Sequence, residues 1–191
     1  MRGICQIKSW LEQLNHDEDS PFKGIIQTAT NPSGLVRDTS ILKMCENSLS
    51  DGVLHRFRDS IRGGGDAECM LQVLKDFWSA VSKVFDDAWG LPPRRSRLMH
   101  GAGIVSLGFI MDAISDRYSY TQIPTEEIFL QDLQILKPIF RWTHGYWDFG
   151  PGAQKKWNDI QNTPKDIQTL ANFLLMQYKN IIWNCDAQMS F

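Results

Sequence analysis

The sequence LPPRRSRLMHGAGIVSLGFIMDAI, residues 91–114, decides the fold class of this chain. Two prolines open the stretch and three arginines follow them, whereas residues 98–111 contain no Lys, Arg, Asp or Glu. On a helix drawn from near Arg94 to Ile114 or Tyr118, apolar side chains cover nearly the whole circumference, which is typical of a helix buried on all sides. The stretch therefore predicts a central helix whose opening turn carries a cluster of cations.

Helical periodicity recurs on both sides of this central stretch. Residues 68–89 carry the most regular pattern, with apolar side chains at intervals of three and four. Pro124 and the pair Thr163 and Pro164 are typical helix starts, and Pro138 is expected to end or kink a helix. Helices are expected at residues 4–14, 39–49 and 68–89, and from residues 94, 124 and 163 onward.

A single segment, residues 22–30, has a composition that favours a strand. Ile25 and Ile26 stand beside two threonines there, and the turn-forming residues 31–34 follow. The 191 residues, 42% of them apolar, suffice for one hydrophobic core. The sequence therefore predicts a mainly α protein, a single-domain helical bundle over residues 1–191 with at most a small β element near residues 22–30.

The charge balance limits the ways in which this chain can bind nucleic acid. A formal net charge of -2 and a pI near 6.1 argue against a protein that coats nucleic acid through its overall charge. A local basic patch remains compatible with that balance. The four cysteines have neither zinc-site spacing nor a close pair, which favours reduced thiols.

The first residues and the longest uncharged run bear on the compartment. Residues 4–14 are interrupted by polar side chains and lack the continuous apolar core of a secretion signal. Residues 98–111 fall short of the roughly 20 residues that span a bilayer. We therefore expect a cytoplasmic protein without a membrane anchor.

The first candidate site is the cationic cluster of the central stretch. Guanidinium groups and free backbone amides at a helix start converge well on an anion such as a phosphate. The alternative is that these side chains are solvated, some of them paired with nearby carboxylates. The candidate contacts are Arg94, Arg95, Arg97 and His100.

The second candidate site is the aromatic and basic segment of residues 140–157. Bases can stack on exposed rings while neighbouring cations meet phosphates. The alternative is an aromatic-rich connection that folds back onto the core, with glycines making its turns. The candidate contacts are Arg141, Trp142, Lys155 and Lys156.

No familiar catalytic, metal-binding or cofactor-binding motif occurs in the sequence. The four histidines are isolated from one another, so none forms a metal-binding pair one helical turn apart. Gly101 and Gly103 do not follow an expected strand, which excludes the dinucleotide-binding fingerprint. We therefore expect no catalytic residues, no metal and no cofactor.

Four phrases resemble one known family. They are SPFKGIIQTATNPSG, ILKMCENSLSDG, LKDFWSAVSKVFDDAWGLPPRRSRLMHGAGIVSLGFIMDAI and NDIQNTPKDIQTLANFLL. In this order they resemble the carboxy-terminal part of bacterial DGQHR-domain proteins, over most of the chain. Those proteins are similar to ParB-like domains and to the regulator associated with DNA phosphorothioate modification, so the resemblance implies a DNA-related context.

The family's namesake motif is absent. Residues 51–56 read Asp-Gly-Val-Leu-His-Arg, with an extra residue and no glutamine, so the likeness to Asp-Gly-Gln-His-Arg is coincidental. No family active-site residue can therefore be carried over to this chain.

The expected function is a nonenzymatic bacterial accessory or binding module that contacts DNA or another protein, in a context of DNA modification, defence or transcription. The alternative is a protein-interaction or oligomerisation module, such as a homodimer, without nucleic-acid binding. In that alternative, the amphipathic helix of residues 4–14 is the element expected to be exposed. An enzyme of unfamiliar type requires a deep pocket lined by convergent ionisable groups.

Overall fold

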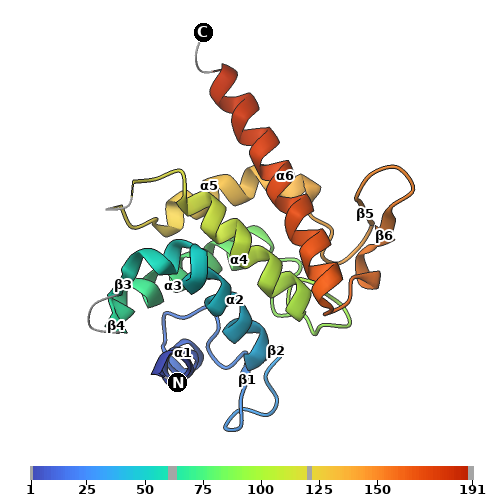
Figure 1. Cartoon of the computed structure of the whole chain (residues 1–191). Coiled ribbons are helices and arrows are strands. Elements are labelled where there is room, and N and C mark those ends of the chain that lie inside the picture. Colours follow the sequence, from blue (N-terminus) through green and yellow to red (C-terminus); the bar gives the residue numbers. More distant parts are fainter. Residues whose placement is uncertain (1, 60–63, 120–121, 189–191) are drawn as a thin grey trace.

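Six α-helices dominate the computed structural model, which describes residues 2–59, 64–119 and 122–188 (Figure 1). This confirms the expected mainly α fold. The helices are α1 Arg2–His16, α2 Asp38–Asp51, α3 Ala67–Val84, α4 Gly101–Ser115, α5 Glu126–Leu136 and α6 Pro164–Gln188. Short 3₁₀ segments lie at η1 Val53–Phe57, η2 Lys137–Ile139 and η3 Trp157–Asp159.

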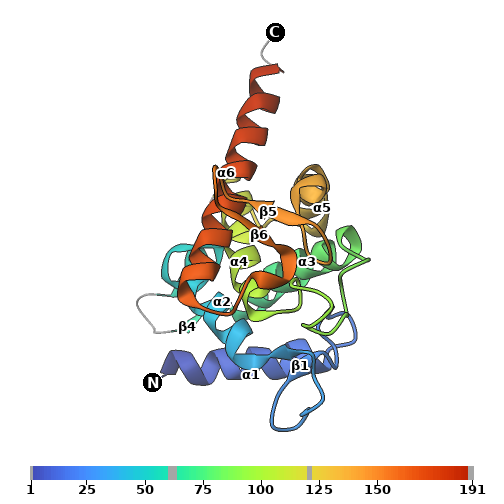
Figure 2. The ribbon, with the colours of Figure 1, turned by 90° about the vertical axis from the view of Figure 1, so that its right-hand side faces the viewer.

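Helix α4 lies at the centre of the described fold, as the uncharged stretch predicts. It packs against α2 on one side and α6 on another, while α3 packs against α5 (Figure 1). Ile104, Leu107, Ile110 and Ile114 of α4 are all fully buried. The later part of α6 extends beyond the body of the molecule in both views (Figures 1 and 2).

Helix α1 packs against α2 and α3, across the lower end of the molecule in Figure 2. Its apolar side chains Ile7, Trp10, Leu11 and Leu14 are at most 4% exposed. From Ile7 onward, the apolar face of the first helix is therefore covered by the chain's own core.

Three pairs of short strands complete the described structure. In the expected region, β1 Ile26–Gln27 pairs in parallel with β2 Val36–Arg37. Two antiparallel pairs lie where the sequence predicted no strand. They are β3 Arg58–Asp59 with β4 Gly64–Gly65, and β5 Tyr146–Asp148 with β6 Gln154–Lys156.

The β1–β2 pair fixes the backbone that leads into α2. Asn15 Oδ1 accepts a hydrogen bond from the Ile26 amide at 3.0 Å, which ties β1 to the end of α1. Gln27 is paired with Arg37, and Arg37 is the N-cap residue of α2. The start of α2 is therefore held in place by strand pairing.

The prediction of a helix from near Arg94 is wrong at the N-terminal end, because α4 begins only at Gly101. Residues 93–100 form turns instead. The Arg97 amide donates to the carbonyl of Trp142 at 2.8 Å, whereas an α-helix would direct it to the carbonyl of Pro93. This long-range hydrogen bond interrupts the helical pattern before His100.

Candidate anion-binding site

The predicted arginine cluster separates into two kinds of residue. Arg94 and Arg95 are exposed, and neither forms an ion pair with a described side chain. Arg97 turns inward, where its guanidinium donates to the carbonyls of Pro93 at 2.6 Å and Asn158 at 2.5 Å. Burial lowers the pKa of Arg97. Arg97 therefore ties its loop to the segment before α6, and only Arg94 and Arg95 stay available to an external anion.

Trp142 is not available to stack on a base. It is 4% exposed and packs among Phe85, Phe140 and Trp147, with ring centroids 5.3–6.2 Å apart. The expectation of a Trp142 contact is therefore corrected: this ring belongs to the core. An aromatic-rich connection folded back onto the core, the alternative for this segment, describes Trp142 and Trp147.

The cations of the same segment are also divided. Arg141 donates to the carbonyls of Pro138 at 2.6 Å and Phe140 at 3.0 Å, and Lys155 pairs with Asp166 at 2.6 Å. Lys156 is exposed and forms no ion pair in the described part of the chain. Of the second candidate set, Arg141 and Lys156 form no ion pair with a described side chain, and only Lys156 is also exposed.

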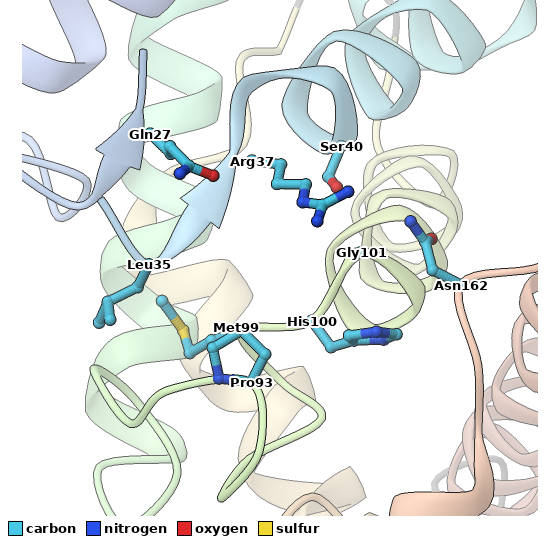
Figure 3. Close-up of a pocket in the computed structure, with 9 residues that line it drawn as sticks. All are labelled: Gln27, Leu35, Arg37, Ser40, Pro93, Met99, His100, Gly101 and Asn162. Atoms are coloured by element: carbon cyan, nitrogen blue, oxygen red, sulfur yellow. The ribbon is translucent and has the colours of Figure 1, made fainter. Parts of the chain in front are cut away.

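A pocket of about 310 Å³ lies where the starts of α2 and α4 meet the residues before α6 (Figure 3). We call it the helix-start pocket. In Figure 3, Arg37 lies at the end of β2 and Ser40 in the first turn of α2, His100 and Gly101 lie at the start of α4, and Asn162 comes from the segment before α6, beside Gly101. The lining residues are Gln27, Leu35, Arg37, Ser40, Pro93, Met99, His100, Gly101 and Asn162.

The start of α2 presents polar groups without internal partners to this pocket. Its N-cap is Arg37, which makes no side-chain capping hydrogen bond. Side-chain capping satisfies first-turn amides that otherwise lack a partner, and arginine is not among the preferred capping residues. Ser40 is 6% exposed, lines the pocket, and its hydroxyl makes no hydrogen bond with the described residues.

His100 caps α4 weakly and stays uncharged near neutral pH. Its Nδ1 lies 3.5 Å from the Ala102 amide, at the limit of a hydrogen bond. Burial, then the nearby charges of Arg97 and Arg37, lower the pKa of His100 to about 4. The imidazole therefore adds no positive charge at pH 7, because burial and, second, the two neighbouring arginines keep its pKa low.

The electrostatics of the helix-start pocket favour an anion. No carboxylate lines it, and Arg37, its formally charged lining residue, forms no ion pair with a described side chain. The nearest acid in sequence, Asp38, is engaged by the Thr39 amide at 2.6 Å. Two helix N-termini add partial positive charge from their backbone dipoles.

Sequence reasoning found His100 in this pocket but missed Arg37, Ser40 and Asn162. Together with His100, these residues come from three segments, each about 60 positions from the next, and only the packing of α2, α4 and α6 unites them. The one local signal is the phrase Arg-Asp-Thr-Ser at residues 37–40, which joins a cation to polar residues of a helix's first turn.

A second pocket, of about 340 Å³, lies between α4 and α6 and contains ionisable groups. Burial raises the pKa of Asp112 to about 6, although Asp112 accepts hydrogen bonds from Ser48 and the Val53 amide. Asp116 pairs with Arg56, and Arg117 contacts Asp132 and Tyr178. These groups are engaged with one another and join helices, so the arrangement favours a structural network.

Within the described ranges, no three His, Cys, Asp or Glu side chains gather as a metal site. Cys45 and Cys69 are free thiols. None of the described helices is both long and apolar enough to cross a bilayer.

Comparison with known proteins found no matching family model, no similar curated protein and no similar solved structure.

Proposed function

We propose that this chain is a nonenzymatic bacterial binding module that holds nucleic acid by its phosphates. In this proposal, the helix-start pocket receives one phosphate, and Arg94 and Arg95 contact phosphates further along the strand. The observation that carries the proposal is the meeting of two helix N-termini and the unpaired Arg37 in a pocket without a carboxylate.

The position of the exposed arginines supports the proposal. Pro93 lines the pocket, and Arg94 and Arg95 follow it directly on the same loop. The alternative role for these cations, pairing with nearby carboxylates, is not observed for either side chain among the described residues. Their charges are therefore available to neutralise phosphates and release counterions.

The resemblance to DGQHR-domain proteins also supports the proposal of nucleic-acid binding, because it implies a DNA-related context. The net charge of -2 fits a local contact of this kind, with the cations gathered on one surface. Few phosphates would then be contacted, and we expect a modest dependence of affinity on salt.

The test measures binding of fluorescently labelled single- and double-stranded DNA and of RNA by anisotropy, at several salt concentrations. The logarithm of the affinity should fall linearly with the logarithm of the salt concentration, by about 0.9 per neutralised phosphate on duplex DNA. The double variant Arg94→Ala, Arg95→Ala should bind more weakly and reduce that slope by up to about 2.

Lys179→Ala is the matched control. Lys179 is exposed, forms no ion pair with a described side chain, and lies 15 positions beyond the start of α6 at Pro164. At about 1.5 Å per residue, this places Lys179 some 22 Å along the helix from the pocket end. Failure to bind any nucleic acid at low salt, or an equal loss in the control, contradicts the proposal.

The alternative function, an interaction or oligomerisation module, was expected to use the amphipathic helix of residues 4–14 as its exposed surface. From Ile7 onward, the apolar face of α1 is packed against the core, so this part is not free for a second copy. Light scattering measures the oligomeric state directly, and no described surface favours a homodimer over nucleic-acid binding.

A further inference from the structure

We infer that the helix-start pocket takes a terminal phosphate, the monoester at the end of a nucleic-acid strand, and not an internal phosphodiester. The inference rests on the proposed nucleic-acid binding and specifies the group that the pocket recognises. It is carried by the buried, unpartnered Ser40 and by the set of donors around it.

Ser40 is the first observation. Its residue is 6% exposed, yet it lines the pocket and its hydroxyl has no hydrogen-bond partner in the described structure. The hydroxyl is open to the pocket, where it can donate a hydrogen bond to a bound acceptor. In Figure 3 the Ser40 oxygen lies beside the Arg37 guanidinium, on the side that faces His100 and Asn162.

The number of donors is the second observation. The Arg37 guanidinium and the Asn162 amide point toward one another across the pocket, and neither makes a side-chain hydrogen bond with the described residues (Figure 3). At the start of α2, the N-cap residue Arg37 makes no side-chain capping hydrogen bond, whereas the Thr39 amide donates to Asp38. Such a set suits a group with several acceptor oxygens and more than one negative charge.

A terminal phosphate meets this requirement better than an internal one. A phosphate monoester has three strong acceptor oxygens and about 1.5 to 2 negative charges at pH 7. An internal diester has two free oxygens and one charge, and both of its ester oxygens continue into sugars. To contact a residue as buried as Ser40, a phosphate has to enter end-on, which a chain terminus allows.

The pocket volume fits this mode of entry. About 310 Å³ is at the lower end of the range for pockets that bind small ligands. That volume suits one phosphate with the sugar next to it, whereas a continuous strand requires an open groove. The exposed Arg94 and Arg95, on the loop beyond Pro93, are placed to contact the next phosphates of the same strand.

The test compares one oligonucleotide sequence in three forms: with a 5′-phosphate, with a 3′-phosphate, and with hydroxyls at both ends. We expect one phosphorylated form to bind on the order of tenfold tighter than the hydroxyl form, as one extra charge-assisted contact implies. Inorganic phosphate should compete for that preference, and the better form identifies which end is held.

Ser40→Ala and Arg37→Gln should each reduce the preference for the phosphorylated end. Arg94→Ala should weaken all three forms by a similar factor, because Arg94 contacts internal phosphates in this account. Circular dichroism and thermal unfolding of each variant show whether it is folded, and Arg37→Gln, at an exposed position, keeps the test interpretable if Ser40→Ala is destabilised.

Equal binding of the three forms overturns the terminal-phosphate inference and leaves the proposed nucleic-acid binding intact. A preference that persists in both pocket variants also overturns the inference, because the terminal phosphate is then held elsewhere. Binding of none of the three forms at low salt contradicts the proposed function itself.

Discussion

Arg94 and Arg97 lie three positions apart in the same cationic cluster, yet the structure gives them different roles. Arg94 is exposed, whereas Arg97 donates to two backbone carbonyls and is half-buried. The sequence identifies the cluster but not this division, because the carbonyl of Asn158 comes from a segment 61 positions away. Which arginine turns inward is decided by tertiary packing.

This difference predicts unequal effects on stability. Arg97→Met should lower the free energy of unfolding by about 1.5–3 kcal/mol, because it removes charged hydrogen bonds to two partly buried carbonyls. Arg94→Met, the matched control, should change it by less than about 0.5 kcal/mol. Urea unfolding measures both, and equal effects would show that Arg97 does not tie the loop.

The buried carboxyl group of Asp112 should make the stability of the fold depend on pH. Burial raises its pKa from 3.8 to about 6, so between these values the folded state binds more protons than the unfolded state. The contribution of Asp112 to the free energy of unfolding is therefore greatest below pH 4 and is lost as the pH rises toward 6. Its upper limit is about 3 kcal/mol, since one pKa unit corresponds to about 1.4 kcal/mol.

Asp112→Asn should remove this dependence while keeping an oxygen that accepts from Ser48 and the Val53 amide. The stability of the variant relative to the parent should therefore rise between pH 4 and pH 7, as measured by urea unfolding. His100 titrates in the opposite sense in this range but is present in both proteins. If the difference in unfolding free energy between variant and parent does not change with pH, burial does not raise the pKa of Asp112.

At the scale of the elements, local signals place most helices well. The starts of α5 and α6 follow the prolines and carboxylates that the sequence offers, and the centre of α4 follows its uncharged stretch. The apolar pattern predicts that α3 ends at residue 89. The helix stops at Val84, although Phe85 and Ala88 continue the apolar pattern as buried turn residues.

The start of α4 could not be predicted because it depends on a distant segment. Arg97 directs its amide to Trp142, and Gly103 packs directly on the carbonyl of Arg97. A Cβ atom at Gly103 would lie 2.1 Å from that oxygen. This close contact between helix and loop holds residues 93–100 beside the pocket.

Gly103→Ala should therefore destabilise the protein by about 1–3 kcal/mol through overpacking, even though alanine favours a helix by up to about 1 kcal/mol over glycine. Gly101→Ala is the control, because its Cβ would meet the exposed side chain of Asn162, which can rotate away. Thermal unfolding compares the two. A Gly103→Ala variant as stable as the parent would mean that the loop is free to move.

For the whole molecule, composition and periodicity suffice to predict a mainly α fold with one central helix. They do not predict the helix-start pocket, because Arg37, Ser40 and Asn162 join His100 only through the packing of α2, α4 and α6. Nor do they show that Trp142 is buried, since an aromatic ring beside cations suits a core and a binding surface equally. The candidate site is therefore a property of the assembled fold.

In the proposed function, phosphate binds at the starts of α2 and α4. The most direct measurement is a titration of the isotope-labelled chain with an end-phosphorylated oligonucleotide, followed through backbone amide chemical shifts. We expect the largest changes at residues 38–41 and 101–103, with smaller changes at Arg94 and Arg95. Changes confined to the α4–α6 pocket around Asp112 and Tyr178, or no changes at saturating ligand, would contradict the account.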